Sequence, residues 1–145
     1  MKVAIGCDPN AMVEKDRIKA LVEKLGHEVV DFGSENPIYA DTAIAVAEYV
    51  SQKNADRGIL ICGTGLGMSI AANKVKGAYA ALLTDQYSTE RSIKSNNANI
   101  ACFGAFTLGP KVMEALTSAW LGYSYTDGTP SAKKIQRFVD YDNER

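Results

Sequence analysis

The stretch ILICGTGLGMSIAANK, residues 59–74, contains the features that decide the fold. A continuous apolar run ends at Cys62, glycines follow at positions 63, 65 and 67, and a segment of small residues comes next. A short apolar run without polar interruptions is typical of a parallel strand that is covered on both faces. The stretch therefore predicts a strand, a glycine turn and a helix, with a thiol at the point where the strand ends.

The alternation of strand and helix continues along the whole chain. The expected strands are Val3–Cys7, Glu28–Phe32, Arg57–Cys62, Tyr79–Leu83 and Asn99–Phe103. The expected helices are Val13–Leu25, Thr42–Gln52, Gly65–Lys74, Ser88–Lys94, Pro110–Leu121 and a last one from about Ser131 to Val139. This alternation predicts βαβ crossovers and an α/β fold, a Rossmann-like three-layer αβα sandwich with a five-stranded parallel sheet.

Length and composition limit the domain organisation and the partners. The 145 residues, 46% hydrophobic and 23% charged, are typical of one domain spanning residues 1–145. A net charge of −1 disfavours nucleic acid and anionic membranes as partners. No apolar run approaches the roughly 20 residues of a membrane span, and the start of the chain does not read as a signal peptide, so we expect a cytoplasmic protein. The three cysteines, Cys7, Cys62 and Cys102, form no metal-binding or disulfide pattern, which argues against both a disulfide framework and a zinc site.

Cys62 stands where a ligand binds in such a sheet, because ligands lie beyond the carboxyl ends of parallel strands. The glycine turn directs backbone N–H groups into one place, and the same field favours thiolate over thiol. Such a thiolate suits a phosphatase nucleophile, a phosphocarrier or the base of an aldose–ketose isomerase. A Cys-x5-Arg phosphatase loop would need arginine where Met68 stands. The alternative is a cysteine that only packs in the core, which is the reading favoured for Cys7 and Cys102.

Three segments carry a resemblance to a known family: MKVAIGCD (1–8), GILICGTGLGMSIAANK (58–74) and NNANIACFGA (96–105). They resemble the ribose-5-phosphate isomerase B / galactose-6-phosphate isomerase family, and the likeness extends through WLGYSYTDG (120–128). The resemblance implies aldose–ketose isomerisation of a sugar phosphate through a cis-enediol, without metal or organic cofactor. It also implies a homodimer or tetramer whose active sites are shared between subunits, with the helix of about 131–139 packing on the partner.

The resemblance also implies roles for individual residues. Cys62 matches the base that moves a proton between C1 and C2, and Thr64 matches a hydroxyl that assists at the sugar oxygen. The amides of Gly63, Gly65 and Gly67 match the loop that holds the enediolate. The other expected substrate contacts are Asp8, Ser69, Ser95, Asn96, Asn99 and Lys133. Of these, Asn96 is expected to reach the substrate from the partner subunit.

The chain departs from the family pattern at several positions. Ser95 stands where the family has the histidine that opens the sugar ring, and Phe106 and Thr129 stand where arginines are common. Lys133 replaces a further arginine, and a point charge does not reproduce the guanidinium fork. The single histidine, His27, precedes the second strand and is far from the ligand edge. Because serine cannot exchange protons near neutral pH as imidazole does, the base of the reaction is retained while the ring opener is lost.

These departures leave several hypotheses open. In the first hypothesis, the chain is an isomerase of altered specificity whose substrate is already open-chain, such as a tetrose phosphate. In the second, it is the Cys62-bearing subunit of a heteromeric enzyme of the galactose-6-phosphate isomerase type, and a paralogous partner supplies the histidine. In the third, it is a non-catalytic homologue that binds a sugar or polyol. A phosphocarrier would carry its cysteine after the first strand rather than after the third, which disfavours that class.

Overall fold

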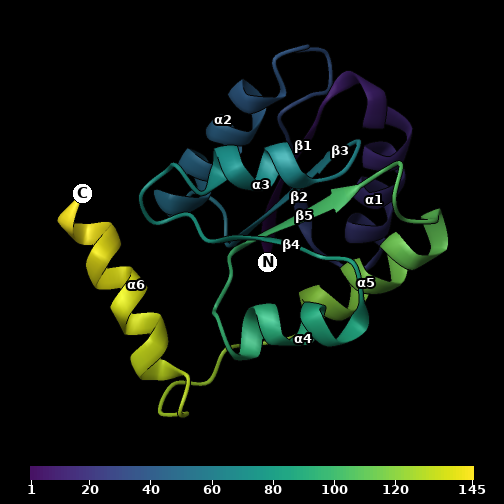
Figure 1. The fold of residues 1–145 in the computed structure, drawn as a ribbon. Coiled ribbons are helices and arrows are strands. Elements are labelled where there is room, and N and C mark those ends of the chain that lie inside the picture. The colour runs from purple at the N-terminus through teal and green to yellow at the C-terminus, as the bar shows by residue number, and fades with distance from the viewer.

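Five parallel strands form the central sheet of the computed structural model, which describes residues 1–145 (Figure 1). The strands are β1 (Lys2–Cys7), β2 (Glu28–Asp31), β3 (Arg57–Cys62), β4 (Ala80–Leu82) and β5 (Ile100–Gly104). The helices are α1 (Met12–Lys24), α2 (Tyr39–Ser51), α3 (Leu66–Ala72), α4 (Gln86–Lys94), α5 (Pro110–Gly122) and α6 (Ala132–Glu144), with a 3-10 turn η1 (Pro9–Ala11). The α/β fold with a five-stranded parallel sheet is thus confirmed.

The apolar strand runs bury residues on both faces of the sheet. Ile59 and Ile61 belong to a core cluster formed with α1, α4 and α5, whereas Leu60 and Cys62 belong to a second cluster formed with α2 and α3. Successive strand residues point to opposite faces, so an uninterrupted apolar run supplies both cores at once. Figure 1 shows the same division, with α2 and α3 together on one face and α1 and α5 on the other. Cys62 therefore faces the α2–α3 layer.

The order of the strands, β2-β1-β3-β5-β4, places the topological switch point between β1 and β3. The chain moves outward from β1 to β2 on one side and continues through β3 on the other, which opens a crevice at the carboxyl ends of these strands. Asp8 follows β1 directly, and its N–H donates to the carbonyl of Ile61 on β3 at 3.1 Å. Cys62 ends β3. Asp8 and Cys62 therefore flank the switch point.

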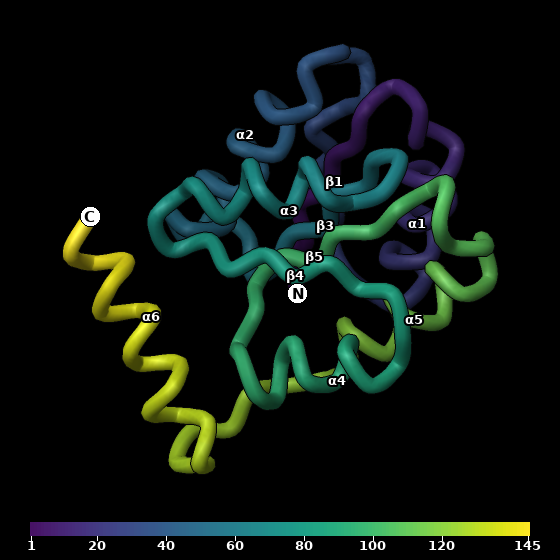
Figure 2. Tube along the Cα trace, viewed as in Figure 1, coloured from purple at the N-terminus to yellow at the C-terminus, as the bar shows by residue number.

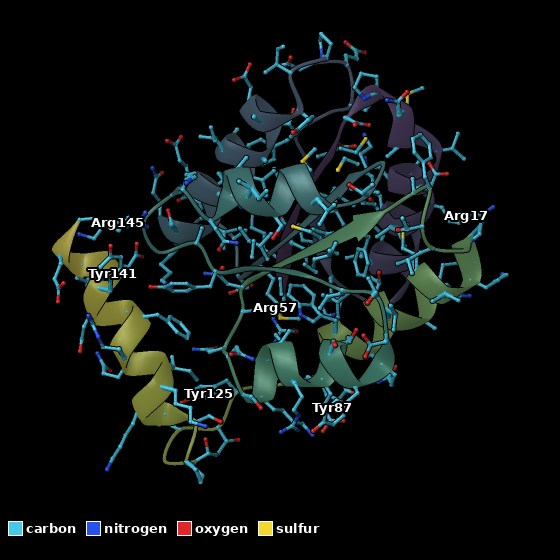
Figure 3. The ribbon with its side chains drawn as sticks, viewed as in Figure 1. Arg17, Arg57, Tyr87, Tyr125, Tyr141 and Arg145 are labelled. Carbon is cyan, nitrogen blue, oxygen red and sulfur yellow. The ribbon has the colours of Figure 1, made fainter.

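The last helix lies apart from the sheet and is longer than expected. The sequence predicts a helix of about residues 131–139, whereas α6 continues to Glu144. Figure 2 shows α6 running along the outside of the molecule. Its C-terminal end is attached through Asp142, whose carboxylate accepts hydrogen bonds from the Gly77 N–H at 2.6 Å and the Tyr79 hydroxyl at 3.0 Å. Arg145, labelled at the end of α6 in Figure 3, donates to the same carboxylate through Nε at 3.1 Å.

We expect Asp142→Ala to release α6 from the body of the protein. Because the buried carboxylate holds one backbone and two side-chain donors, its loss should speed hydrogen exchange of the α6 amides by about tenfold or more. Asp140→Ala is the matched control, since Asp140 lies on the same helix and bonds only to Gln136. Equal exchange rates in the two variants would contradict this role of Asp142.

The same contact should depend on pH. Burial opposes ionisation of Asp142, but the bonds from Arg145, Gly77 and Tyr79 outweigh it and hold the pKa of the carboxyl below its ordinary value of 3.8. A group whose pKa is lowered by folding stabilises the folded state above its unfolded pKa. This contribution is lost as the pH falls through the folded pKa of Asp142. Protection of α6 should therefore be constant at neutral pH and decrease in acid, whereas the Asp142→Ala variant should lack this acid step.

No helix of this chain combines the length and the apolar character that crossing a bilayer requires. The three cysteines are free thiols. No group of three or more His, Cys, Asp or Glu side chains lies close enough together to hold a metal ion.

Candidate active site

Cys62 ends β3 at the carboxyl edge of the sheet, and its side chain is held by the turn that follows. The backbone N–H of Gly65 donates to the Sγ of Cys62 at 3.1 Å. This N–H donor fixes the position of the sulfur relative to the turn. Only 5% of Cys62 is exposed, so the sulfur is shielded from bulk solvent. The predicted glycine turn therefore lies against the predicted base.

The glycines of this turn are needed because other groups occupy the space of a side chain. Gly65 has φ of +78°, and a β-carbon there would lie 3.0 Å from the carbonyl carbon of Phe103 on β5. A β-carbon on Gly63 would lie 2.9 Å from the ring of Phe106. A β-carbon on Gly67 would collide with the hydroxyl and ring of Tyr39. The alternate glycines thus let the turn pack between β5 and two aromatic rings.

The segment that follows β5 fixes the turn from the other side. The N–H of Ala105 donates to the Cys62 carbonyl at 2.8 Å, and the N–H of Phe106 donates to the Gly63 carbonyl at 2.9 Å. These bonds continue the β3–β5 pairing beyond the sheet. The position of Cys62 is therefore set by two neighbouring backbones, which is the rigidity that a catalytic group needs.

The two polar residues expected beside Cys62 lie at this edge. Thr64 is exposed, and its Oγ1 accepts a long bond from the Leu66 N–H at 3.3 Å. Asp8 is 8% exposed, and one of its carboxylate oxygens accepts from the Asn10 N–H at 2.9 Å, so it caps η1. Asp8 thus has a structural role in the chain, and its contact with a substrate hydroxyl stays a prediction.

The other two cysteines lie in environments that keep them protonated. Burial raises the pKa of Cys7 to about 12. Burial also raises the pKa of Cys102, as does the nearby Cys62, while a hydrogen bond with the expected site residue Ser69 opposes the rise. Both side chains are fully buried. Among the three thiols, Cys62 is thus the one with an amide donor on its sulfur, and it is 5% exposed whereas the other two are fully buried.

Three further predicted residues, Ser95, Asn96 and Asn99, lie at the opposite edge of the sheet. Ser95 and Asn96 follow α4, just before the chain enters β5 at its N-terminal end. The Ser95 Oγ accepts from Arg91 Nη1 at 3.1 Å, and the Asn96 amide donates to the Arg91 carbonyl at 2.9 Å. The Asn99 side chain donates to the Gly77 carbonyl and accepts from the Tyr79 N–H. Binding of substrate by these residues stays a prediction.

Within one chain the two groups of residues cannot meet. Cys62 is the last residue of β3, whereas Asn99 precedes the first residue of its neighbour β5. The six residues of β3 span about 20 Å at about 3.3 Å per residue. Lys133 is an exposed residue on the first turn of α6, and its contact with the substrate stays a prediction. A substrate that contacts Cys62 and Asn96 together would therefore need two copies of the chain.

Tyr39 is a neighbour of the turn that the sequence analysis missed. The expected helix began at Thr42, so Tyr39 was assigned to a loop, but α2 begins at Tyr39 itself. Its ring covers Gly67, and Phe106, which is 73% exposed, covers Gly63. The sequence carries no periodicity that would bring Tyr39 next to residues nearly thirty positions later. Its position follows from the packing of α2 on α3.

The three main cavities of the chain are lined by other residues than Cys62. The largest, of about 600 Å³, lies between β4, α4 and α6. A single chain therefore does not enclose a substrate in these cavities beside the sulfur.

Comparison with known proteins gives consistent matches along the chain. Residues 3–138 match the family described as Ribose/Galactose Isomerase. D-erythrulose-4-phosphate isomerase of Pectobacterium atrosepticum is 38% identical over 148 residues, which cover 99% of this chain and 97% of that protein. Ribose-5-P isomerase B of Listeria innocua is 43% identical over 136 residues, 92% of each chain. The solved structure of Clostridium thermocellum ribose-5-phosphate isomerase B superposes with a TM-score of 0.93 at 37% identity, covering 99% of both chains.

Proposed function

The chain belongs to the ribose/galactose isomerase family, and we propose on this premise that it interconverts an aldose phosphate and a ketose phosphate that are already open-chain. The observation that carries the proposal is the Cys62 turn, in which the Gly65 N–H donates to the sulfur. The second observation is Ser95, which stands where a ring-opening imidazole would be expected. These observations support a base at Cys62, and position 95 lacks the imidazole that would open a cyclic substrate.

In the proposed reaction the Cys62 thiolate removes the proton from the carbon beside the carbonyl. The electrons of the broken C–H bond form the carbon–carbon double bond of the enediolate, and the carbonyl oxygen takes up the negative charge. The amides of Gly63, Gly65 and Gly67 are proposed to stabilise this oxygen, and Thr64 to move a proton between the two oxygens. The thiol then returns its proton to the neighbouring carbon. A positioned base contributes about 10²- to 10⁴-fold, and an oxyanion donor about 10²- to 10³-fold.

A four-carbon sugar phosphate fits this machinery best. When the oxygen on C4 carries the phosphate, it cannot attack the carbonyl to close a five-membered ring, so the substrate stays linear. No ring opener is then required, which removes the need for histidine at position 95. The Pectobacterium atrosepticum relative, named D-erythrulose-4-phosphate isomerase, supports a substrate of this length.

The proposed site is shared between two copies of the chain. Cys62 and Asp8 lie at the carboxyl edge of the sheet, whereas Ser95 and Asn96 lie at the opposite edge. A homodimer that places one edge against the other would bring both groups to a single substrate. The separated edges support this arrangement, and α6, which stands outside the sheet, is proposed to pack on the partner (Figure 2).

The test is the rate of exchange in D₂O with tetrose, pentose and hexose phosphates, followed by proton NMR. We expect deuterium to enter the carbon beside the carbonyl, with kcat/KM at least tenfold higher for the tetrulose phosphate than for ribose 5-phosphate. A chain that prefers the cyclic pentose phosphate would contradict the open-chain proposal. A chain that exchanges no substrate alone, but does so after mixing with a histidine-bearing paralogous chain, would identify it instead as one subunit of a heteromeric isomerase.

A further inference from the structure

A buried lysine that takes no part in the proposed reaction lies at the carboxyl edge of the sheet. Lys15 on α1 is 4% exposed, and it is the only one of the 16 lysine and arginine residues that is buried. Arg17 on the same helix, labelled in Figure 3, keeps 46% of its side chain exposed. Removing an ammonium group from water is costly unless the group is paired and hydrogen-bonded. Lys15 therefore requires a compensating partner.

That partner is Asp31, the last residue of β2. Lys15 Nζ donates to both carboxylate oxygens at 3.0 Å, and Lys19 Nζ adds a bond of 3.3 Å from the surface. Burial opposes ionisation of Asp31, but the bonds from the Gly33 N–H and from the two lysines outweigh it and hold its pKa below the ordinary value of 3.8. Burial likewise lowers the pKa of Lys15, but Asp31 outweighs this effect and raises it above 10.5. Both groups are therefore charged at neutral pH.

The Asp31 carboxylate also orders the turn after β2, and that turn is bonded to the end of β1. The Gly33 N–H donates to Asp31 Oδ1 at 2.8 Å, and the Gly33 carbonyl accepts from the Cys7 N–H at 3.3 Å. Both contacts use backbone groups of Gly33 and Cys7, so they do not depend on those two side chains. Asp8 is the next residue along the chain. A continuous series of contacts thus leads from Lys15 to the residue that is expected to bind a substrate hydroxyl.

A buried ion pair is not the arrangement that would make the protein most stable. The cost of removing two charges from water offsets much of their attraction, and well-packed apolar residues in their place are often as stable. An ammonium that donates to both oxygens of one carboxylate does, however, fix the direction of that carboxylate. Because the same carboxylate accepts from Gly33, this pair sets the place of the turn as well as that of α1.

We propose that Lys15 is a positioning residue, which holds the Asp31 carboxylate and thereby fixes the end of β1 and the carboxylate of Asp8. This inference rests on the proposed function, in which Asp8 contacts the substrate. One oxygen of Asp8 accepts from the Asn10 N–H at 2.9 Å, which leaves the second oxygen for a substrate hydroxyl. A hydroxyl can be bound well only if this second oxygen has a fixed position. Lys15 supplies that position from behind the site, without touching the substrate.

Amide hydrogen exchange tests the contact without any substrate. In Lys15→Met, the amides of Gly33, Cys7 and Asp8 should exchange about tenfold faster than in wild type, relative to the β5 amides, which report global unfolding. The matched control is Lys19→Met, which removes the more exposed donor to the same carboxylate and should exchange as wild type does. Equal protection of the three amides in both variants would overturn the proposal.

A double variant separates the positioning role from a contribution to stability. Lys15→Met leaves the Asp31 charge with only Lys19 and should lower the urea midpoint, whereas Lys15→Met with Asp31→Leu removes both charges of the pair and should regain most of the midpoint. Both variants should nevertheless show a KM for the tetrulose phosphate about tenfold above wild type, with kcat within about twofold. A double variant that regained the wild-type KM together with stability would show that the pair acts through stability alone, and the proposal would be wrong.

The two measurements also keep this inference apart from the proposed isomerase activity. Selective loss of amide protection at Asp8 in Lys15→Met, in a chain that exchanges deuterium into no sugar phosphate, would uphold the positioning of Asp8 and refute the isomerase. Unchanged protection and an unchanged KM in an active Lys15→Met variant would uphold the isomerase and refute the positioning role.

Discussion

Cys62→Ala is expected to abolish deuterium incorporation into the sugar and to lower kcat/KM by about 10²- to 10⁴-fold. The physical reason is that Cys62 is the proposed base, and alanine carries no group that can accept a proton from carbon. Asp8 caps η1 with one oxygen, and Thr64 is a neutral hydroxyl. The Gly65 N–H, which donates to the sulfur at 3.1 Å in the wild type, loses its acceptor. The turn should otherwise persist, because the Ala105 and Phe106 amides still bond to its backbone.

The control is Cys7→Ala, which removes another strand-end thiol. Cys7 is fully buried, and burial raises its pKa to about 12, so it holds its proton at neutral pH. Exchange in Cys7→Ala should stay within a few-fold of wild type. Alkylation provides a second measurement, since iodoacetamide should modify Cys62 in the folded protein and leave Cys7 and Cys102 unmodified. A Cys62→Ala enzyme that still exchanges deuterium at the wild-type rate would exclude the thiolate as base.

The sheet could be predicted from sequence because each strand contains enough local information. In Arg57–Cys62 the apolar run is uninterrupted, which is expected only when both faces are covered, and the structure buries Ile61 and Leu60 on opposite faces. Gly26 was expected to end the first helix, and it follows α1 with φ of +92°, where a side chain would be strained. These features are set by residues within one turn or one strand. The predicted fold is therefore confirmed, and the family resemblance is confirmed by the match over residues 3–138.

Features that depend on distant contacts were not predictable in this way. Tyr39 covers Gly67 only because α2 packs on α3, and no sequence pattern in residues 33–41 predicts this contact. The last turn of α6 extends to Glu144 because Asp142 finds the Gly77 N–H and the Tyr79 hydroxyl across the fold. The cavity that Arg91 lines together with residues 124–131 likewise involves parts of the chain that are more than thirty residues apart. Such contacts are set by the tertiary structure rather than by the local sequence.

Gly65→Ala is expected to damage both stability and catalysis, and to do so more than a comparable glycine substitution elsewhere. Gly65 has φ of +78°, where a β-carbon costs about 1–2 kcal/mol in any protein. The new carbon would also lie 3.0 Å from the Phe103 carbonyl carbon, which is backbone in the centre of the sheet and cannot move away. Strain and overpacking together should lower the free energy of unfolding by about 2–5 kcal/mol. Urea unfolding followed by circular dichroism measures the change.

Gly33→Ala separates the two causes, because Gly33 has φ of +87° but nothing within 4 Å of the added carbon. It should therefore show the backbone strain alone, about 1–2 kcal/mol, with deuterium exchange close to wild type. In Gly65→Ala the N–H that bonds to the Cys62 sulfur is displaced, so kcat/KM should fall by a further 10²- to 10³-fold under conditions where the variant is still folded. If both variants lost the same stability and kept the same activity, the close approach of this turn to β5 would not be what positions the thiolate. The difference between the two alanine variants, at glycines of similar φ, thus measures how much of the catalysis depends on the position of the turn.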